Sequence, residues 1–235
     1  MKVHVLGCHG PYPIAGGATS GYLISHQGEN ILMDCGSGIL GKLLSLCDPA
    51  SLTAVLLSHL HFDHASDLLV LGYLLQTRGK KLTVYVPPED DSPLKKLLSP
   101  QVYDVLPYPE EMEIAGIRIT TCPTRHPVPC RALRLEAEGK TLVYTGDTNT
   151  CPGLAAFASG ADMLLADAAF TENEWSEKAP HLCAREAARL ALESNARALR
   201  LTHLPVGRTP AALEKEAAAL FPNTKAVSPG EVILI

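Results

Sequence analysis

The stretch LLSHLHFDHASD, residues 56–67, places three histidines and an aspartate within six positions, directly after an apolar run. His59 and His61 are separated by one residue, so in an extended chain both imidazoles point to the same side and can converge on one ion. Asp63 and His64 follow where the chain turns into the next helix, which lets them face a second ion. Imidazole and carboxylate donors suit Zn²⁺, Mn²⁺ or Fe. The stretch therefore predicts a site for two metal ions.

Three further polar residues stand at the ends of apolar runs that we expect to be strands. His126 follows IRITTCPTR, Asp147 follows TLVYTG, and His203 follows LRLT. Strand ends are where sites are commonly built, because a rigid scaffold holds the ligands while loops admit substrate. We expect these strand ends to meet at one edge of the molecule, together with the histidine-rich turn.

Short β-rich runs alternate with amphipathic stretches along the chain, with no fixed repeat and no low-complexity linker. In the first half, the pattern predicts strands over 2–7, 21–25, 29–34, 52–58 and 82–86, and helices over 38–46 and 65–77. In the second half it predicts hairpins over 112–122 and 132–146, strands over 161–170, 198–204 and 232–235, and helices over 183–194 and 209–221. We predict an α/β (α+β) fold of two sheets with helices on their outer faces, and one domain over 1–235.

Composition excludes some classes of protein. The net charge of -5 and the pI near 6.0 come without a basic face of the kind that grips long nucleic acids. The N-terminus has no signal-peptide pattern, and no apolar run reaches the length of a membrane span. Seven cysteines, never spaced as Cys-x-x-Cys, suit reduced thiols. We expect a cytoplasmic protein that acts on a small molecule, with no membrane partner and with surfaces left open for a homodimer.

The order of these residues resembles the metallo-β-lactamase-fold hydrolase superfamily. His-x-His-x-Asp-His is followed by a His, then Gly-Asp, then Thr-His near the end, and Asp34 in LMDCGSG resembles the early aspartate that supports the metal loop. The resemblance implies a four-layer αββα sandwich. It also implies a ligand set in which one metal is bound by His59, His61 and His126, the other by Asp63, His64 and His203, and both by Asp147.

In this family a hydroxide held between the two ions is the nucleophile, since a bound metal lowers the pKa of water to about 7. The resemblance therefore implies a dinuclear enzyme, with zinc as the first choice of metal and manganese or iron as alternatives. Asp67 lies one turn after Asp63 and His64 on the expected helix. It either supports a ligand from behind or is a solvated helix residue.

The family branches differ in substrate. A secreted β-lactamase would show a signal peptide and, in its commonest class, a cysteine in place of Asp147. Glyoxalase II-like thioesterases and lactonases usually continue the first motif as His-x-x-Gly, whereas Ala65 and Ser66 follow here. The phosphodiesterase branch, similar to ribonuclease Z, fits better because Thr202 precedes His203, although the long basic arm that holds transfer RNA is not recognisable. A lactonase or thioesterase is the alternative, and a noncatalytic carrier or regulatory protein is a second.

His181 matches the histidine of that branch's His-x-Thr-Ala motif, although Cys183 replaces the threonine. We assign catalytic roles to Asp63 and His181, the latter as an acid for the leaving alkoxide at the start of the helix predicted over 183–194. The glycine-rich segment 8–23 lies where the family places a loop over the site, and its N–H groups either cradle a phosphate or simply form turns. The role of His9 in that segment stays open.

Overall fold

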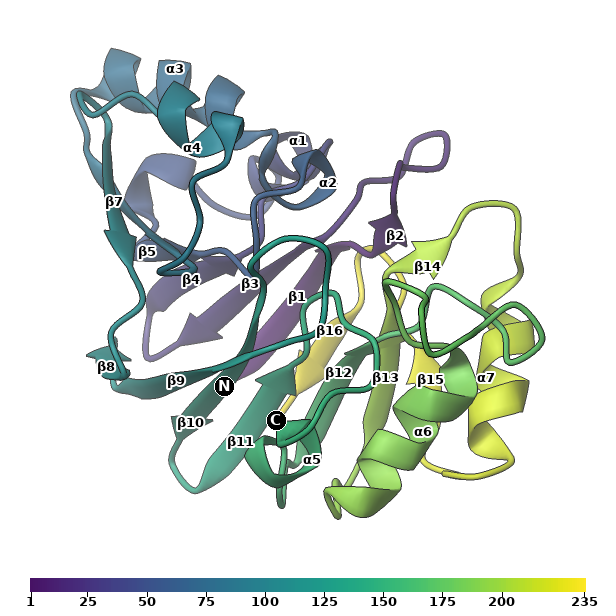
Figure 1. The fold of residues 1–235 in the computed structure, drawn as a ribbon. Helices are drawn as coiled ribbons and strands as arrows, with labels where there is room; N and C mark the ends of the chain where they lie inside the picture. The colour runs from purple at the N-terminus through teal and green to yellow at the C-terminus, as the bar shows by residue number, and fades with distance from the viewer.

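The computed structural model describes all residues, 1–235, and contains two seven-stranded sheets packed face to face (Figure 1). The first sheet runs in the order β16 (Val232–Leu234), β1 (Lys2–Gly7), β3 (Gly21–His26), β4 (Glu29–Met33), β5 (Ala54–Leu56), β6 (Leu82–Val86) and β7 (Tyr103–Pro107). The second runs in the order β15 (Thr224–Ala226), β13 (Leu199–Thr202), β12 (Met163–Asp167), β11 (Lys140–Tyr144), β10 (Arg131–Ala137), β9 (Ile117–Pro123) and β8 (Glu111–Ile114).

Helices cover the outer face of each sheet (Figure 1). The first sheet carries α1 (Ile39–Leu43), α2 (Phe62–Ala65), α3 (Leu68–Arg78) and α4 (Pro93–Leu97), with a 3-10 turn over Pro49–Ser51. The second carries α5 (Leu154–Phe157), α6 (Ala184–Glu193) and α7 (Pro210–Ala218). This arrangement confirms the predicted four-layer αββα sandwich. None of these helices has the length and apolar character needed to cross a membrane.

Alternation along each strand builds two hydrophobic cores. On β4, Ile31 and Met33 face the second sheet and join the core between the sheets, whereas Leu32 faces α1 and α3. Side chains of a strand alternate between its two faces, so one short apolar run serves both layers. The result is a rigid frame on which loops at the strand ends are held in place.

Both predicted hairpins form. The turn of the β8–β9 hairpin has Ala115 and Gly116 at positive φ, and that of the β10–β11 hairpin has Glu138 and Gly139 at positive φ. Two consecutive residues of this kind make the two-residue turn whose twist matches antiparallel strands. The register of these two strand pairs is therefore set locally by their turns.

The helix predicted over 65–77 is divided. α2 ends at Ala65, and α3 begins at Leu68 after Asp67. At the break, the backbone N–H of Asp67 donates to the carbonyl of Cys35 at 3.0 Å rather than within the helix, and its carboxylate accepts a hydrogen bond from the backbone N–H of Leu40 at 2.8 Å, in the first turn of α1. That turn has no side-chain cap of its own, so Asp67 satisfies one of its free donors.

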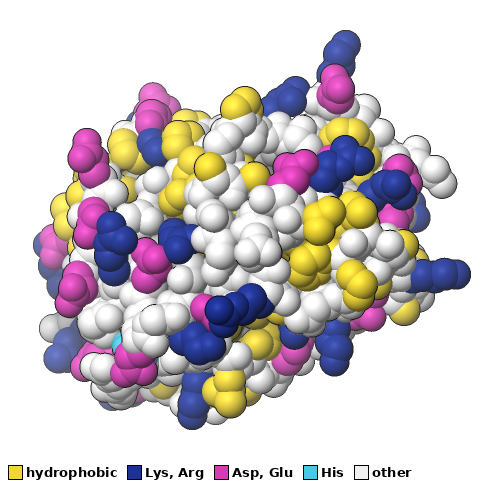
Figure 2. All heavy atoms as spheres, turned by 90° about the horizontal axis from the view of Figure 1, so that it is seen from below, with side chains coloured by type: hydrophobic (Ala, Val, Ile, Leu, Met, Phe, Trp, Pro, Cys, Tyr) yellow, Lys and Arg dark blue, Asp and Glu magenta, His cyan; other side chains and the backbone are white.

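A third, two-stranded sheet joins the sandwich near its edge. β2 (His9–Gly10) pairs in parallel with β14 (Leu204–Pro205), which follows His203 directly. The glycine-rich segment 8–23 is thus tied to one of the predicted metal ligands. On the face shown in Figure 2, lysine and arginine side chains are mixed with aspartate and glutamate rather than gathered in one field.

Candidate metal centre

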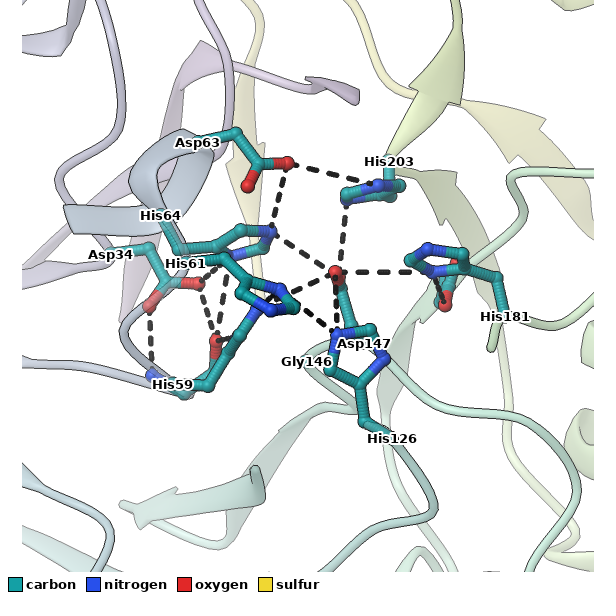
Figure 3. Close-up of polar contacts among 12 residues, drawn as sticks. Asp34, His59, His61, Asp63, His64, His126, Gly146, Asp147, His181 and His203 are labelled. Atoms are coloured by element: carbon teal, nitrogen blue, oxygen red, sulfur yellow. Dashed lines mark hydrogen bonds and ion pairs between the residues drawn. The ribbon is translucent and has the colours of Figure 1, made fainter. Parts of the chain in front are cut away.

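The strands of the second sheet bring the distant ligands together. β9, β11 and β13 run in the same direction, because β10 is antiparallel to both its neighbours and β11, β12 and β13 are mutually parallel. His126, Asp147 and His203 therefore follow the same edge of the sheet, opposite the turn after β5 that carries His59 and His61. Figure 3 shows these side chains pointing toward one another.

The first cluster consists of three imidazoles and one carboxylate. Nδ1 of His61 lies 3.0 Å from Nε2 of His59 and 3.1 Å from Nε2 of His126. Oδ2 of Asp147 lies 3.6 Å from Nε2 of His59 and 3.8 Å from Nε2 of His126. Donors around a tetrahedral zinc ion, at about 2.0 Å each, stand roughly 3.3 Å apart. The spacing of these four donors fits one such ion.

The second cluster uses the other oxygen of the same aspartate. Oδ1 of Asp147 lies 3.3 Å from Nε2 of His64 and 3.1 Å from Nδ1 of His203. Oδ2 of Asp63 completes the group. It lies 3.7 Å from Nε2 of His64 and 4.0 Å from Nε2 of His203. Asp147 thus offers one oxygen to each cluster, in the bridging position that the resemblance implies.

Three buried atoms at the centre have no hydrogen-bond partner: Nε2 of His64, Oδ1 of Asp147 and Nδ1 of His203. Leaving such atoms unsatisfied in the interior costs about 1–3 kcal/mol each. All three aim at the second cluster, where a cation would satisfy them at once. The donor set and these orphaned atoms both fit divalent metal ions.

Asp34 supports the histidine-rich turn through hydrogen bonds on the side away from the metal clusters. Its Oδ2 lies 2.8 Å from Nδ1 of His64 and accepts hydrogen bonds from Ser58 Oγ and Tyr144 Oη, each at 2.8 Å. Ser58 Oγ in turn lies 3.1 Å from Nδ1 of His59. Partners of this kind fix ring orientation and tautomer in metal sites, so Asp34 orients a ligand of each cluster. Asp34 adopts a left-handed backbone, with φ of 55°, which aspartate tolerates better than most residues.

The hydrogen bonds assign the free nitrogen of two ligands. His126 donates from Nδ1 to the carbonyl of Pro180 at 3.1 Å, and His64 donates from Nδ1 to the Asp34 carboxylate. Since these oxygens only accept, a neutral ring keeps its lone pair on Nε2. In both residues Nε2 is the atom that faces the cluster, so each ring presents a lone pair for metal binding.

Electrostatics prepare the clusters for cations. Burial lowers the pKa of His59, His61 and His126, which favours the neutral imidazole that a metal requires. Burial alone would raise the pKa of Asp147, but the surrounding histidines hold it well below its usual range. Burial opposes the charged form of His64 as well, yet the carboxylates of Asp147 and Asp34 raise its pKa. The carboxylate between the clusters is therefore ionised at neutral pH.

His181 lies beside the clusters, but not on a helix. It precedes Cys183, the residue that caps α6, and its Nδ1 donates to Oδ2 of Asp167 at 2.8 Å. Its Nδ1 also lies 3.8 Å from Oδ2 of Asp147. Burial opposes protonation here, but Asp167 raises the pKa of His181 to about 9. The predicted helix N-terminus lies two residues further along the chain, and the Asp167 carboxylate is a partner that the sequence did not predict.

Asp167 is the main residue that the sequence reading missed. It ends β12 and accepts a second hydrogen bond, from the N–H of Thr148, at 3.0 Å. It is buried, and with Asp147 and His181 it forms a third group of closely spaced donors. Its signal was available, since MLLAD ends an apolar strand with a carboxylate as TLVYTG does before Asp147. Asp67, by contrast, is engaged with α1, and no hydrogen bond joins it to a metal ligand.

Two glycines let backbone approach the site closely. A Cβ on Gly10 would lie 2.0 Å from Nε2 of His203, and a Cβ on Gly36 would lie 1.9 Å from the carbonyl oxygen of Asp63. Segment 8–23 therefore packs directly on one ligand, and the loop after β4 packs on the turn that carries another. His9, on β2 in the same segment, is buried.

Comparison with known proteins agrees with this geometry. Residues 29–204 match the model of the beta-lactamase superfamily domain. YhfI of Bacillus subtilis, a probable metallo-hydrolase, is 36% identical over 94% of both chains. The crystal structure of YhfI, a metallo-beta-lactamase fold protein, superposes with a TM-score of 0.94 over 99% of this chain and 98% of that one, at 33% identity.

More distant relatives include the ribonuclease Z of Metallosphaera sedula, 28% identical over 94% of both chains. The short form of human tRNase Z shares the fold, with a TM-score of 0.80 at 18% identity over 100% of this chain and 99% of that one. The family match covers the histidine-rich turn, the bridging aspartate and the last histidine. The chain belongs to the beta-lactamase superfamily and has the metallo-β-lactamase fold.

Proposed function

We propose that this protein is a dinuclear metal-dependent phosphodiesterase that hydrolyses small or cyclic nucleotide-type phosphodiesters. The observation that carries the proposal is the Asp167–His181 pair, whose imidazole lies against the bridging Asp147 but is not needed to complete either cluster. A charged, oriented imidazole beside two cation sites is what cleavage of a phosphodiester with a poor leaving group requires.

Two divalent ions bound by these residues would supply an activated water and neutralise charge on the phosphoryl oxygens. Zinc is the metal that the nitrogen-rich first cluster favours, with manganese or iron as alternatives. His59, His61 and His126 would hold one ion, Asp63, His64 and His203 would hold the other, and Asp147 would serve both.

His181 acts on the leaving group in this proposal. Asp167 engages Nδ1, so Nε2 is the nitrogen free to donate a proton to the departing alkoxide. With a pKa of about 9 the ring is protonated at neutral pH, as a general acid must be. Bound cations nearby would lower that pKa, and the Asp167 carboxylate opposes this shift.

The net charge of the chain and its similarity to ribonuclease Z bear on the size and chemistry of the substrate. The chain has a net charge of -5, which does not favour the binding of a long nucleic acid. Kinship with proteins named ribonuclease Z supports phosphodiester chemistry. Together they favour a small diester over transfer RNA, with no membrane partner. A homodimer is compatible with this proposal.

A substrate panel tests the reaction class. Protein loaded with zinc or with manganese is assayed against a chromogenic phosphodiester, a phosphomonoester, a lactone, a thioester and a cephalosporin. We expect the diester to be cleaved fastest. Efficient turnover of the lactone or thioester beside an inert diester would support the lactonase or thioesterase alternative. Inertness toward every substrate under both metals would support a noncatalytic role.

A further inference from the structure

A cavity of about 270 Å³ adjoins the first metal cluster. It lies between α2, α4 and the loop that follows His126, and the imidazole of His61 forms part of its wall. The volume is just under the range of pockets that hold a drug-sized ligand, so it accommodates one ring system rather than a whole nucleotide. Most of the remaining wall is apolar: Leu60, Phe62, Pro93, Leu94 and Val128.

Phe62 is the unusual member of this wall. It stands between His61 and Asp63, inside the metal-binding motif, yet 67% of its surface is exposed. Leu94, on α4, also lines the cavity, but it is 1% exposed and belongs to the hydrophobic core on the outer side of the first sheet. An aromatic ring in this position is free to stack on a flat group that enters the cavity.

The one carboxylate in the wall of the cavity disfavours an anionic occupant. Asp90 lines it, and neither lysine nor arginine does. Asp90 is 5% exposed, and its Oδ1 accepts a hydrogen bond from the N–H of Ser92 at 2.8 Å. A buried carboxylate repels a phosphate but can accept from an amino group, such as the one that adenine carries.

We infer that this cavity binds the aromatic base of a nucleotide substrate, with Phe62 stacked on the base while the phosphodiester lies at the metal clusters. The inference rests on the proposed function, since it assigns the base-binding part of that same site. Continuity through His61 supports it, because a group in the cavity lies only one side chain away from the ligands of the first metal.

The first test measures binding without turnover. Metal-loaded protein is titrated calorimetrically with adenosine 5′-monophosphate and with ribose 5-phosphate, which carries the same phosphate without a base. We expect the nucleotide to bind about tenfold more tightly or better, within the range that base stacking on an aromatic side chain provides. Phe62→Ala should abolish the difference, and Phe62→Tyr, which keeps a ring, should retain it. The metal content of each variant is measured alongside.

Tyr73→Ala is the matched control. Tyr73 is an aromatic residue on α3 with 70% of its surface exposed, and it lies outside the cavity. We expect this variant to prefer the nucleotide as strongly as the unmodified protein does. Loss of the preference in Tyr73→Ala as well would overturn the assignment of the base to the cavity beside Phe62.

The second test uses two diesters with the same leaving group, the 4-nitrophenyl esters of adenosine 5′-phosphate and of methyl phosphate. Phe62→Ala should lower the ratio of kcat/KM for the nucleoside ester to that for the methyl ester about tenfold, mainly through KM. Sedimentation of both proteins shows whether Phe62 instead contacts a second copy. A change of mass without a change of base preference would overturn the inference.

The two tests separate the inference from the proposed function. Base-dependent binding with both diesters inert would uphold the cavity assignment and refute the phosphodiesterase. Cleavage of both diesters with equal binding of the nucleotide and the sugar phosphate would uphold the phosphodiesterase and refute the cavity assignment.

Discussion

Oδ2 of Asp167 accepts a hydrogen bond from Nδ1 of His181 at 2.8 Å and a second from the backbone N–H of Thr148 at 3.0 Å. The backbone N–H of Thr148 thus holds the carboxylate in place, and the carboxylate in turn orients the imidazole of His181. This arrangement matters for catalysis, because a histidine that protonates a leaving group must be both charged and correctly oriented.

Asp167→Asn should shift the pH dependence of diester cleavage. The carboxylate raises the pKa of His181, so the acid stays protonated to a higher pH than an ordinary histidine does. A general acid works below its pKa, and without the negative charge of Asp167, burial lowers the pKa of His181 while only Asp147 remains to raise it. The alkaline limb of the kcat profile should therefore move to lower pH, with metal content unchanged. An unmoved limb would show that His181 is not the titrating acid.

His181→Ala should slow turnover of a diester with an alkyl leaving group by about 10²-fold or more, a typical contribution of a general acid. A nitrophenyl diester should be much less affected, because nitrophenolate leaves without a proton. Both metals should stay bound, as measured by elemental analysis. His4→Ala, on β1 outside the site, is the control. Near-normal rates on both substrates would remove His181 from the mechanism.

Asp147→Ala and Asp63→Ala should differ in metal stoichiometry. Asp147 lies in both clusters, whereas Asp63 belongs to the second alone. We expect the first variant to lose most of both metals and the second to retain about one equivalent per chain, since a lost ligand weakens its own ion most. Inductively coupled plasma mass spectrometry measures this directly. Equal retention by the two variants would contradict the bridging arrangement.

Tyr144→Phe should weaken metal binding without touching a ligand. It removes one of the donors to Asp34, which orients His64 directly and His59 through Ser58. Loss of such a partner typically lowers metal affinity about 10- to 100-fold. Competition with a chromogenic chelator measures the affinity. Tyr108→Phe is the matched control, because Tyr108 is also buried and donates to the carbonyl of Leu57 instead.

The sequence predicted the two-sheet fold, both hairpins and the convergence of seven ligand candidates, because apolar periodicity and motif spacing are local properties. It missed β7, Tyr103–Pro107, where mostly exposed side chains and a terminal proline hide the pattern of an edge strand. It extended a helix through Asp67 because the hydrogen bond to Leu40 joins residues far apart in the chain.

Asp167 escaped for a related reason. Its role depends on its distance from His181, which is set by the β12 strand end and by the loop 168–182 that follows, and no spacing rule reports that distance. The helix predicted over 183–194 forms as α6, Ala184–Glu193, with Cys183 at its N-cap position, so the place of His181 just before a helix could be predicted from the sequence. Buried hydrogen-bonded pairs such as Asp167 and His181 form through tertiary packing, so they are the part of a site that a single sequence predicts least well.

Because the ligands are divided between the two halves of the chain, the metal clusters can be completed only late in synthesis. The nascent first half carries His59, His61, Asp63 and His64, but neither cluster is complete until the strand ends of the second sheet have been made. His203 follows β13, one of the last strands to leave the ribosome. Tight metal capture must therefore come after the second sheet has docked on the first. A ribosome stalled before β13 would hold a chain that has all four residues of the first cluster but lacks His203 of the second, so the second cluster can be completed only in a nearly finished chain.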